Sequence, residues 1–174
     1  MKMIDELKSI ERISIKDLLN SSDVWNSIKV DYHHPYVERL WTDIEDYRLS
    51  LHVIHRCEMT ESLYHPHNWP SAMHILDGIY QMGIGYNKKG LHTEPSDIST
   101  LTTFENHGEM YYEMVEKDGY HYVKPSSDVC HTIMLSGIPW GTGSPKSDKP
   151  LTELSEERKE EIRKWFLDYF NHKN

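Results

Sequence analysis

The stretch His65-Pro66-His67-Asn68-Trp69-Pro70 decides how this chain is interpreted. Successive side chains of a β-strand point to opposite faces, so the two imidazoles of a His-x-His pair point to the same side. Two neutral imidazoles side by side supply half of a transition-metal site. Strand-like sequence lies on both sides of the stretch, over residues 48–54 and 73–76. The stretch therefore predicts a metal site held between β-strands.

The composition restricts the classes of protein to consider. A chain of 174 residues fits one domain and can bury a core. The net charge of −9 argues against a nucleic-acid partner, which would need a basic surface. Cys57 and Cys130 lie in apolar stretches, so we expect buried thiols rather than a disulfide. The acidic start is unlike a secretory signal, and no stretch has the ~20 apolar residues of a membrane span, so we expect a soluble cytoplasmic protein without a membrane partner.

The first 45 residues are predicted to form a helical N-terminal extension packed on the main domain. Ser14 with Asp17 resembles a capping box, which predicts a helix from residue 15. A second short helix is expected after Ser21 or Ser22. The apolar residues of the segment 37–44 recur at helical spacing, which predicts a third helix.

From about residue 46 to 140 the pattern changes to alternation, which predicts short β-strands separated by turns. Lys117-Asp118-Gly119 is typical of a tight hairpin turn, and residues 88–97 are predicted to be a loop. Many short strands without a βαβ pattern predict an antiparallel sandwich or barrel. The strands are expected over residues 49–54, 62–67, 73–76, 79–84, 99–104, 109–116, 120–123 and 129–135.

The last part of the chain, residues 141–174, is predicted to be a linker followed by one amphipathic helix. Gly, Ser, Pro and Lys dominate residues 141–150. Ser155 is a good N-cap, and the acidic residues after it favour the helix dipole. The apolar stripe of this helix is expected to pack on the barrel or on a second subunit.

With these elements in place, the chain resembles the cupins, which are jelly-roll β-barrels. The first cupin motif has a His-x-His pair, then a Glu, then six further residues and a Gly. His65 and His67 match the pair and Gly78 matches the glycine, while Ser71 stands where most cupins have the Glu ligand. The resemblance therefore implies a mainly β, cupin-type antiparallel jelly-roll barrel whose metal site lacks its usual carboxylate.

The second cupin motif supplies one more histidine. His121, two residues after Gly119, fits it and is our preferred third ligand. His131 is the alternative, although this fit needs a one-residue insertion. His74 would face away from the interior if strand alternation holds, so we interpret it as a structural residue.

A set of three histidines is similar to the site of the cysteine dioxygenase branch of the cupins. The resemblance implies one divalent transition metal, with Fe(II) first and Zn, Ni or Mn as alternatives. It also implies a small metal-chelating substrate, but the cross-link cysteine of the branch is absent at Ser71, so cysteine is not the expected substrate. Arg39 is the candidate for the arginine that binds the substrate carboxylate in that branch. The residues expected to line the substrate pocket are Arg39, Ser71, Met73 and Tyr80, with His131 as a candidate catalytic acid or base.

These features lead to three functional hypotheses. The first is a mononuclear non-heme metal oxygenase that acts on a small chelating molecule. The second keeps the metal but assigns redox-neutral isomerase or lyase chemistry. The third is a non-catalytic cupin that binds a small ligand. The open sheet edges of a jelly roll are also compatible with a homodimer.

Overall fold

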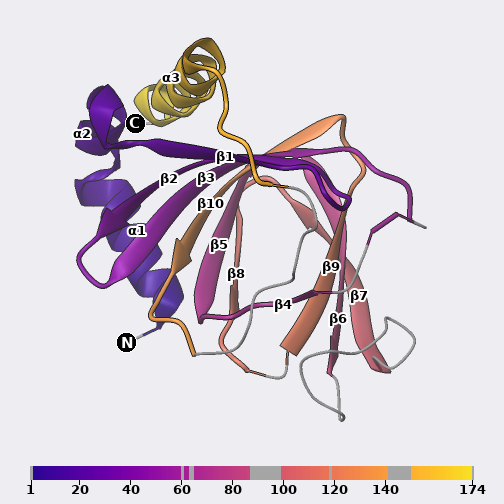
Figure 1. The fold of residues 1–174 in the computed structure, drawn as a ribbon. Helices are drawn as coiled ribbons and strands as arrows, with labels where there is room; N and C mark the ends of the chain where they lie inside the picture. Colours follow the sequence, from indigo (N-terminus) through magenta and orange to yellow (C-terminus); the bar gives the residue numbers. More distant parts are fainter. Residues whose placement is uncertain are drawn as a thin grey trace.

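The computed structural model describes residues 2–59, 61–62, 65–86, 99–117, 119–140 and 150–173 (Figure 1). Two antiparallel sheets face each other. The first has six strands in the order β1-β2-β3-β10-β5-β8, and the second has four in the order β4-β9-β6-β7. The strands are β1 (Asn26–Val30), β2 (Val37–Ile44), β3 (Tyr47–His55), β4 (His65–Pro66), β5 (Ser71–Asp77), β6 (Ile79–Tyr86), β7 (Ser99–His107), β8 (Met110–Met114), β9 (Gly119–Pro125) and β10 (Val129–Ser136).

The chain passes repeatedly from one sheet to the other between β3 and β10. Strands β3, β10, β5 and β8 lie in one sheet, and strands β4, β9, β6 and β7 lie in the other. Such paired Greek keys define a jelly roll. The predicted fold class is therefore confirmed as a mainly β, cupin-type jelly roll, with β1 and β2 added at the edge of the first sheet.

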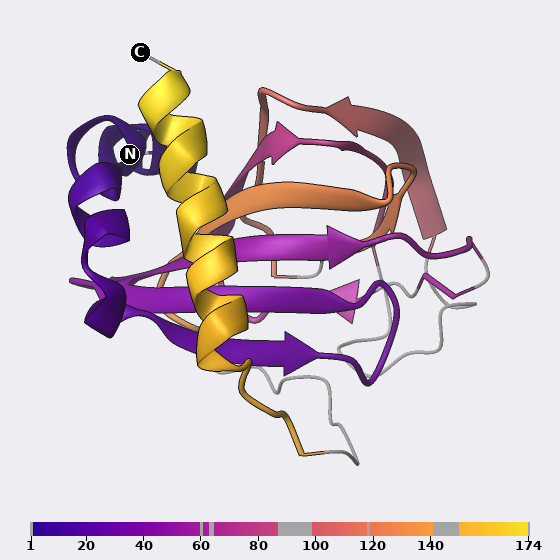
Figure 2. The same cartoon turned by 90° about the horizontal axis from the view of Figure 1, so that it is seen from above.

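The helices cover the outer face of the six-stranded sheet (Figure 1). They are α1 (Met3–Ile13), α2 (Ile15–Asn20), the 3₁₀ helix η1 (Ser22–Val24) and α3 (Glu156–His172). Figure 2 shows α3 lying across the strands on the side that also carries α1 and α2. Ser155 caps α3 as predicted, because its hydroxyl accepts a hydrogen bond from the backbone N–H of Arg158 at 3.2 Å.

Apolar residues form two clusters on the two faces of the six-stranded sheet. The outer cluster joins this sheet to the helices and includes Leu51, Ala72, Leu135 and Phe166. The inner cluster lies between the sheets and consists of Ile54, Ile75, Tyr80, Met82, Val123 and Cys130. Both cysteines are free and buried, as expected.

Gly78 links β5 to β6, and the backbone requires a glycine there. Its φ is +90°, and a Cβ would lie 2.7 Å from the carbonyl oxygen of Val129 and 2.8 Å from the Sγ of Cys130. The glycine that closes the quoted sequence motif therefore has a structural reason in this chain.

The helical prediction for the N-terminal region is correct only as far as residue 24. Residues 26–30 form β1, and the helix predicted over residues 37–44 is wrong because that segment is β2, paired along its length with β3. Val37, Leu40, Trp41 and Ile44 have helical spacing, but Leu40 packs in the outer cluster while Val37 packs against the inner one. Pairing with β3 therefore outweighs the local pattern.

The hairpin predicted at residues 117–119 is also wrong. Strand β8 pairs with β5 in the first sheet, whereas β9 pairs with β4 and β6 in the second. Asp118 lies outside the described residues, as do the whole of the predicted loop at 88–97 and all but the last residue of the predicted linker at 141–150. The predicted strand 62–67 is described only in part, since residues 63–64 are also outside, and β4 comprises His65–Pro66.

Candidate metal centre

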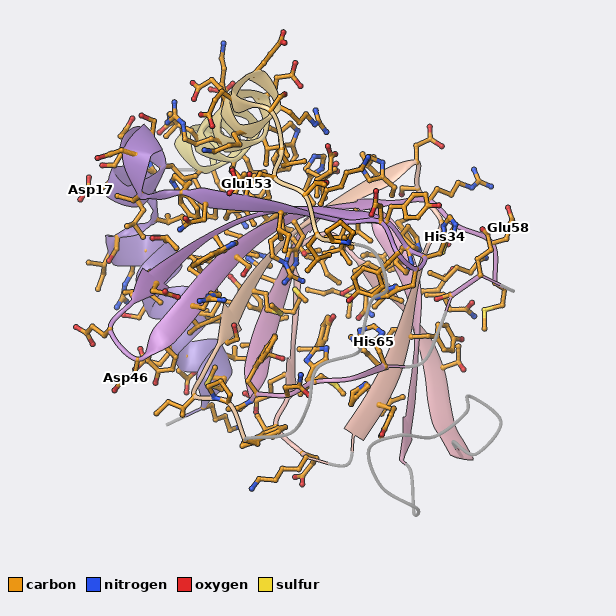
Figure 3. All side chains as sticks on the ribbon, in the orientation of Figure 1. Asp17, His34, Asp46, Glu58, His65 and Glu153 are labelled. Carbon is orange, nitrogen blue, oxygen red and sulfur yellow. The ribbon has the colours of Figure 1, made fainter. Side chains whose placement is uncertain are left out.

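Three histidines come together on the inner side of the second sheet. His65 on β4 is the register partner of His121 on β9, and His67 follows two residues after His65. Figure 3 shows His65 on the side of the six-stranded sheet opposite to the helices. The sequence analysis predicted these three residues as the metal ligands, and the structure brings them together.

The ring nitrogens of the three side chains converge. The Nε2 atoms of His67 and His121 are 2.9 Å apart, and those of His121 and His65 are 3.0 Å apart. One potential ligand atom from each residue lies within 4.8 Å of the others. Within the described part of the chain, the group contains no carboxylate. The carboxylate-free set inferred from Ser71 is therefore what the geometry presents.

The remaining ring nitrogens have partners that orient two of the three imidazoles. The Nδ1 of His121 lies 3.3 Å from the Sδ of Met82, and a thioether can only accept. Nδ1 therefore carries the hydrogen, and Nε2 presents its lone pair to the cluster. The Nδ1 of His67 is 2.8 Å from the hydroxyl of Ser71. Such partners of the second nitrogen fix ring orientation and tautomer at metal sites.

Burial keeps two of these imidazoles, those of His67 and His121, neutral. The pKa of His67 is lowered to about 3 by burial, with further contributions from His65 and Arg39. Burial, His65 and His67 also hold the pKa of His121 well below its ordinary value. Neutral imidazole is the form that binds a metal ion, so the three residues fit a divalent transition metal.

A polar wall faces the interior from β2 and β3, and it is formed by Arg39, Ser50 and His52. Arg39 and His52 are direct register partners. The Nε of Arg39, the Oγ of Ser50 and the Nε2 of His52 are all buried without a hydrogen-bond partner. Unsatisfied buried polar atoms are rare and call for an explanation.

Sequence reasoning found Arg39 but missed Ser50 and His52. These two alternate along β3 with Leu49 and Leu51, so the pattern resembles a strand with one solvated face. In the structure both faces of β3 are covered, because Leu51 belongs to the outer cluster and Ile54 to the inner one. The topology, which a local pattern does not contain, would have been needed to identify them.

The other residues predicted to line the substrate pocket are Ser71, Met73 and Tyr80, and all three are buried. Ser71 is buried beside His67, where its hydroxyl contacts the ring. Met73 lies on the inner face of β5 and is buried. Tyr80 is fully buried in the inner cluster, where its hydroxyl donates to that of Tyr112 at 2.8 Å. Ser71 is therefore a support for His67, and Tyr80 is part of the apolar core.

His131 and His74 lie on the outer face and not with the cluster. The His131 ring stacks on Trp165 of α3, with centroids 3.6 Å apart, because odd-numbered residues of this part of β10 face the helices. The geometry thus gives no support to His131 as third ligand or catalytic residue. The Nδ1 of His74 lies 2.7 Å from a carboxylate oxygen of Glu11 on α1, and its ring stacks on Tyr111. The structural interpretation of His74 agrees with this position.

A groove of about 320 Å³ lies beside the histidine-bearing stretch. It is lined by Trp69, by the acidic turn between β2 and β3, and by the segment after β10. None of the three clustered histidines lines it. The groove is therefore a separate surface feature.

The comparisons with known proteins address the fold. No protein-family model matches the sequence, and no curated protein matches it. Among solved structures, hydroxypropylphosphonic acid epoxidase from S. wedmorenis has 10% identity and a TM-score of 0.50, with 67% of this chain and 56% of that chain covered. The Fe(II) form of HppE with an alternative substrate, (S)-1-HPP, has 11% identity and a TM-score of 0.51, with 67% and 57% covered.

A third similar structure is an RmlC-like cupin family protein with a double-stranded β-helix fold from Methanocaldococcus jannaschii. It has 13% identity and a TM-score of 0.41, with 64% of this chain and 81% of that chain covered. This chain spans little more than half the length of the two epoxidase-type structures. No described helix is both long enough and apolar enough to cross a bilayer. At these identities the likeness concerns the fold, and the chain has a cupin-type jelly roll with a three-histidine group able to hold a metal ion.

Proposed function

We propose that this protein is a mononuclear non-heme metal enzyme that uses Fe(II) as an oxygenase on a small, anionic, metal-chelating substrate. The observation that carries the proposal is the convergence of three imidazoles without a carboxylate, two of which burial keeps neutral. Three neutral ligands leave the ion its full positive charge and leave coordination positions open. Bound there, Fe(II) would supply Lewis acidity and one-electron redox chemistry.

The protein's own residues would hold the metal and position the substrate. His65, His67 and His121 would be the ligands, and Ser71 would hold the ring of His67 in place. The guanidinium of Arg39 has a buried, unpartnered Nε on the polar wall, which favours a substrate with an anionic group. The Fe(II) bound by HppE, a structure of similar fold, supports iron as the first metal to test.

The experiment is oxygen uptake by protein purified without air and loaded with Fe(II). The substrates are a panel of small carboxylic acids that carry a thiol, hydroxyl or oxo group next to the carboxylate. We expect uptake that depends on one panel member and is abolished in His121→Ala. Turnover that continues in anaerobic buffer would contradict the oxygenase and favour a redox-neutral isomerase or lyase.

A further inference from the structure

His52 is a buried histidine that the proposed ligand set does not use. Its side chain lies on β3 with 3% of its surface exposed. The Nδ1 is 3.2 Å from the hydroxyl oxygen of Thr132 on β10, while the Nε2 is buried and has no hydrogen-bond partner. The protein thus supplies a hydrogen-bond partner for Nδ1, whereas Nε2 is available to a bound ligand.

His52 belongs to the polar wall and interacts electrostatically with His67 of the histidine cluster. It is the register partner of Arg39 on one side and of Thr132 on the other. Its pKa is held well below the ordinary value, first by burial and then by electrostatic interaction with Arg39 and His67. His52 is therefore near both groups and stays neutral.

His74 and His131 on the outer face also have a buried ring nitrogen without a hydrogen-bond partner, but His52 is the register partner of Arg39, whose Nε is unpartnered too. Leaving a buried polar group unsatisfied costs about 1–3 kcal/mol, a cost that an apolar residue would avoid. Thr132 satisfies only one ring nitrogen. Arg39, the register neighbour, can only donate, so it cannot pair with an Nε2–H. An occupant that pairs with Arg39 must offer acceptor atoms, and His52 pairs with the same occupant when its Nε2 donates.

We propose that His52, through its Nε2–H, donates a hydrogen bond to the anionic ligand that binds on the open side of the three-histidine centre. With Arg39 it makes a two-donor site for acceptor atoms, and Thr132 fixes the tautomer by donating to Nδ1. His52 is thus a ligand-positioning residue. The inference rests on the proposed metal centre, because that centre holds the other end of the ligand.

The test uses Co(II) as the metal and azide as the anion. Visible absorption of the Co(II) protein gives both the metal stoichiometry and the azide Kd for wild type, His52→Leu and His52→Gln. We expect His52→Leu to bind Co(II) at the wild-type stoichiometry but azide about tenfold more weakly, as for a lost hydrogen bond to a charged group. His52→Gln keeps an N–H donor, and its azide Kd should stay within about threefold of wild type.

The matched control is His131→Leu, which removes a buried histidine from the outer face. It should leave the azide Kd unchanged. A wild-type azide Kd in fully loaded His52→Leu would overturn this inference and leave the metal centre standing. Wild-type protein that takes up no Co(II) would instead overturn the metal centre, and the inference with it. If His52→Leu does not fold, His52→Phe keeps a planar ring without nitrogen, and the same two results apply to it.

Discussion

The two faces of the six-stranded sheet carry histidines with different neighbours. On the outer face, His74 lies beside the carboxylate of Glu11 and stacks on an aromatic ring, and His131 stacks on Trp165. In the interior, His67 and His121 lie against each other at 2.9 Å, with Arg39 raising the local positive potential. A carboxylate and an aromatic partner make a histidine part of the scaffold. Imidazoles whose Nε2 atoms converge without a carboxylate form a set that a cation would stabilise.

The largest expected effect is a loss of stability from a substitution on the outer face that leaves metal binding on the inner face unchanged. Phe166 is fully buried in the outer cluster, so Phe166→Ala should lower the free energy of unfolding by about 3–5 kcal/mol. Metal content per folded chain should not change, because the ligands lie on the other face. Urea unfolding and metal analysis of the same preparations measure both. Loss of metal from protein that is still folded would show that the faces are not independent.

The second prediction concerns the outer histidine that most resembles a functional residue. His74→Ala removes the imidazole that lies 2.7 Å from Glu11, whose side chain is 9% exposed and keeps the hydroxyl of Tyr111 as a partner. Breaking such a buried pair from one side costs about 3 kcal/mol, again without loss of metal. The double variant His74→Ala/Glu11→Ala should recover part of this loss in urea unfolding. A double variant less stable than the single one would contradict the pairing.

The third prediction concerns the hydrogen bond that orients His67 in the three-histidine cluster. Ser71→Ala removes the hydroxyl 2.8 Å from the Nδ1 of His67. Partners of this kind typically change metal affinity by about 10–100-fold. Competition with a chromogenic chelator measures the affinity, and Ser27→Ala, a buried serine on the edge strand β1, is the control. Equal metal affinity in Ser71→Ala and wild type would contradict a role of Ser71 in orienting His67.

The last prediction is a pH dependence of the metal-free protein, which is the smallest effect when taken over one pH unit. The pKa of His67 is about 3 in the folded state, below the ordinary value of 6.5. In that window the unfolded chain binds a proton that the folded chain does not, so stability falls as the pH falls from about 6.5. One such group contributes about 1.4 kcal/mol per pH unit. Urea unfolding at several pH values should therefore show a smaller slope for His67→Gln, and an unchanged slope would contradict the assigned cause.

Local patterns predicted the fold wherever they agreed with the long-range pairing. The strands from β3 onward and the cap of α3 follow from alternation and from Ser155, and the His-x-His pair with Gly78 indicated the jelly roll. The segment Val37–Ile44 satisfies both a helical and a strand pattern, and only its pairing with β3 decides between them. The sequence of residues 117–119 predicts a hairpin, because three residues do not indicate that the strands before and after them belong to different sheets.

The same distinction applies to the candidate site. His65, His67 and His121 were found because each follows a spacing rule within a strand or after a turn. His131 satisfied a similar rule, but the face on which β10 places it depends on register. His52 and Ser50 satisfied none, since a polar residue alternating with leucines is the usual pattern of a solvated face. Their burial is evident only from the tertiary structure, in which the helices and the second sheet cover the two faces of β3.

The most direct test of the central claim is the metal content of protein purified under anaerobic conditions with Fe(II) supplied. We predict about one metal ion per chain in wild type and in His131→Ala, and a nearly complete loss in His65→Ala, His67→Ala and His121→Ala with the fold intact. Unchanged metal content in these three variants, or a wild-type protein that stays metal-free, would contradict the three-histidine centre.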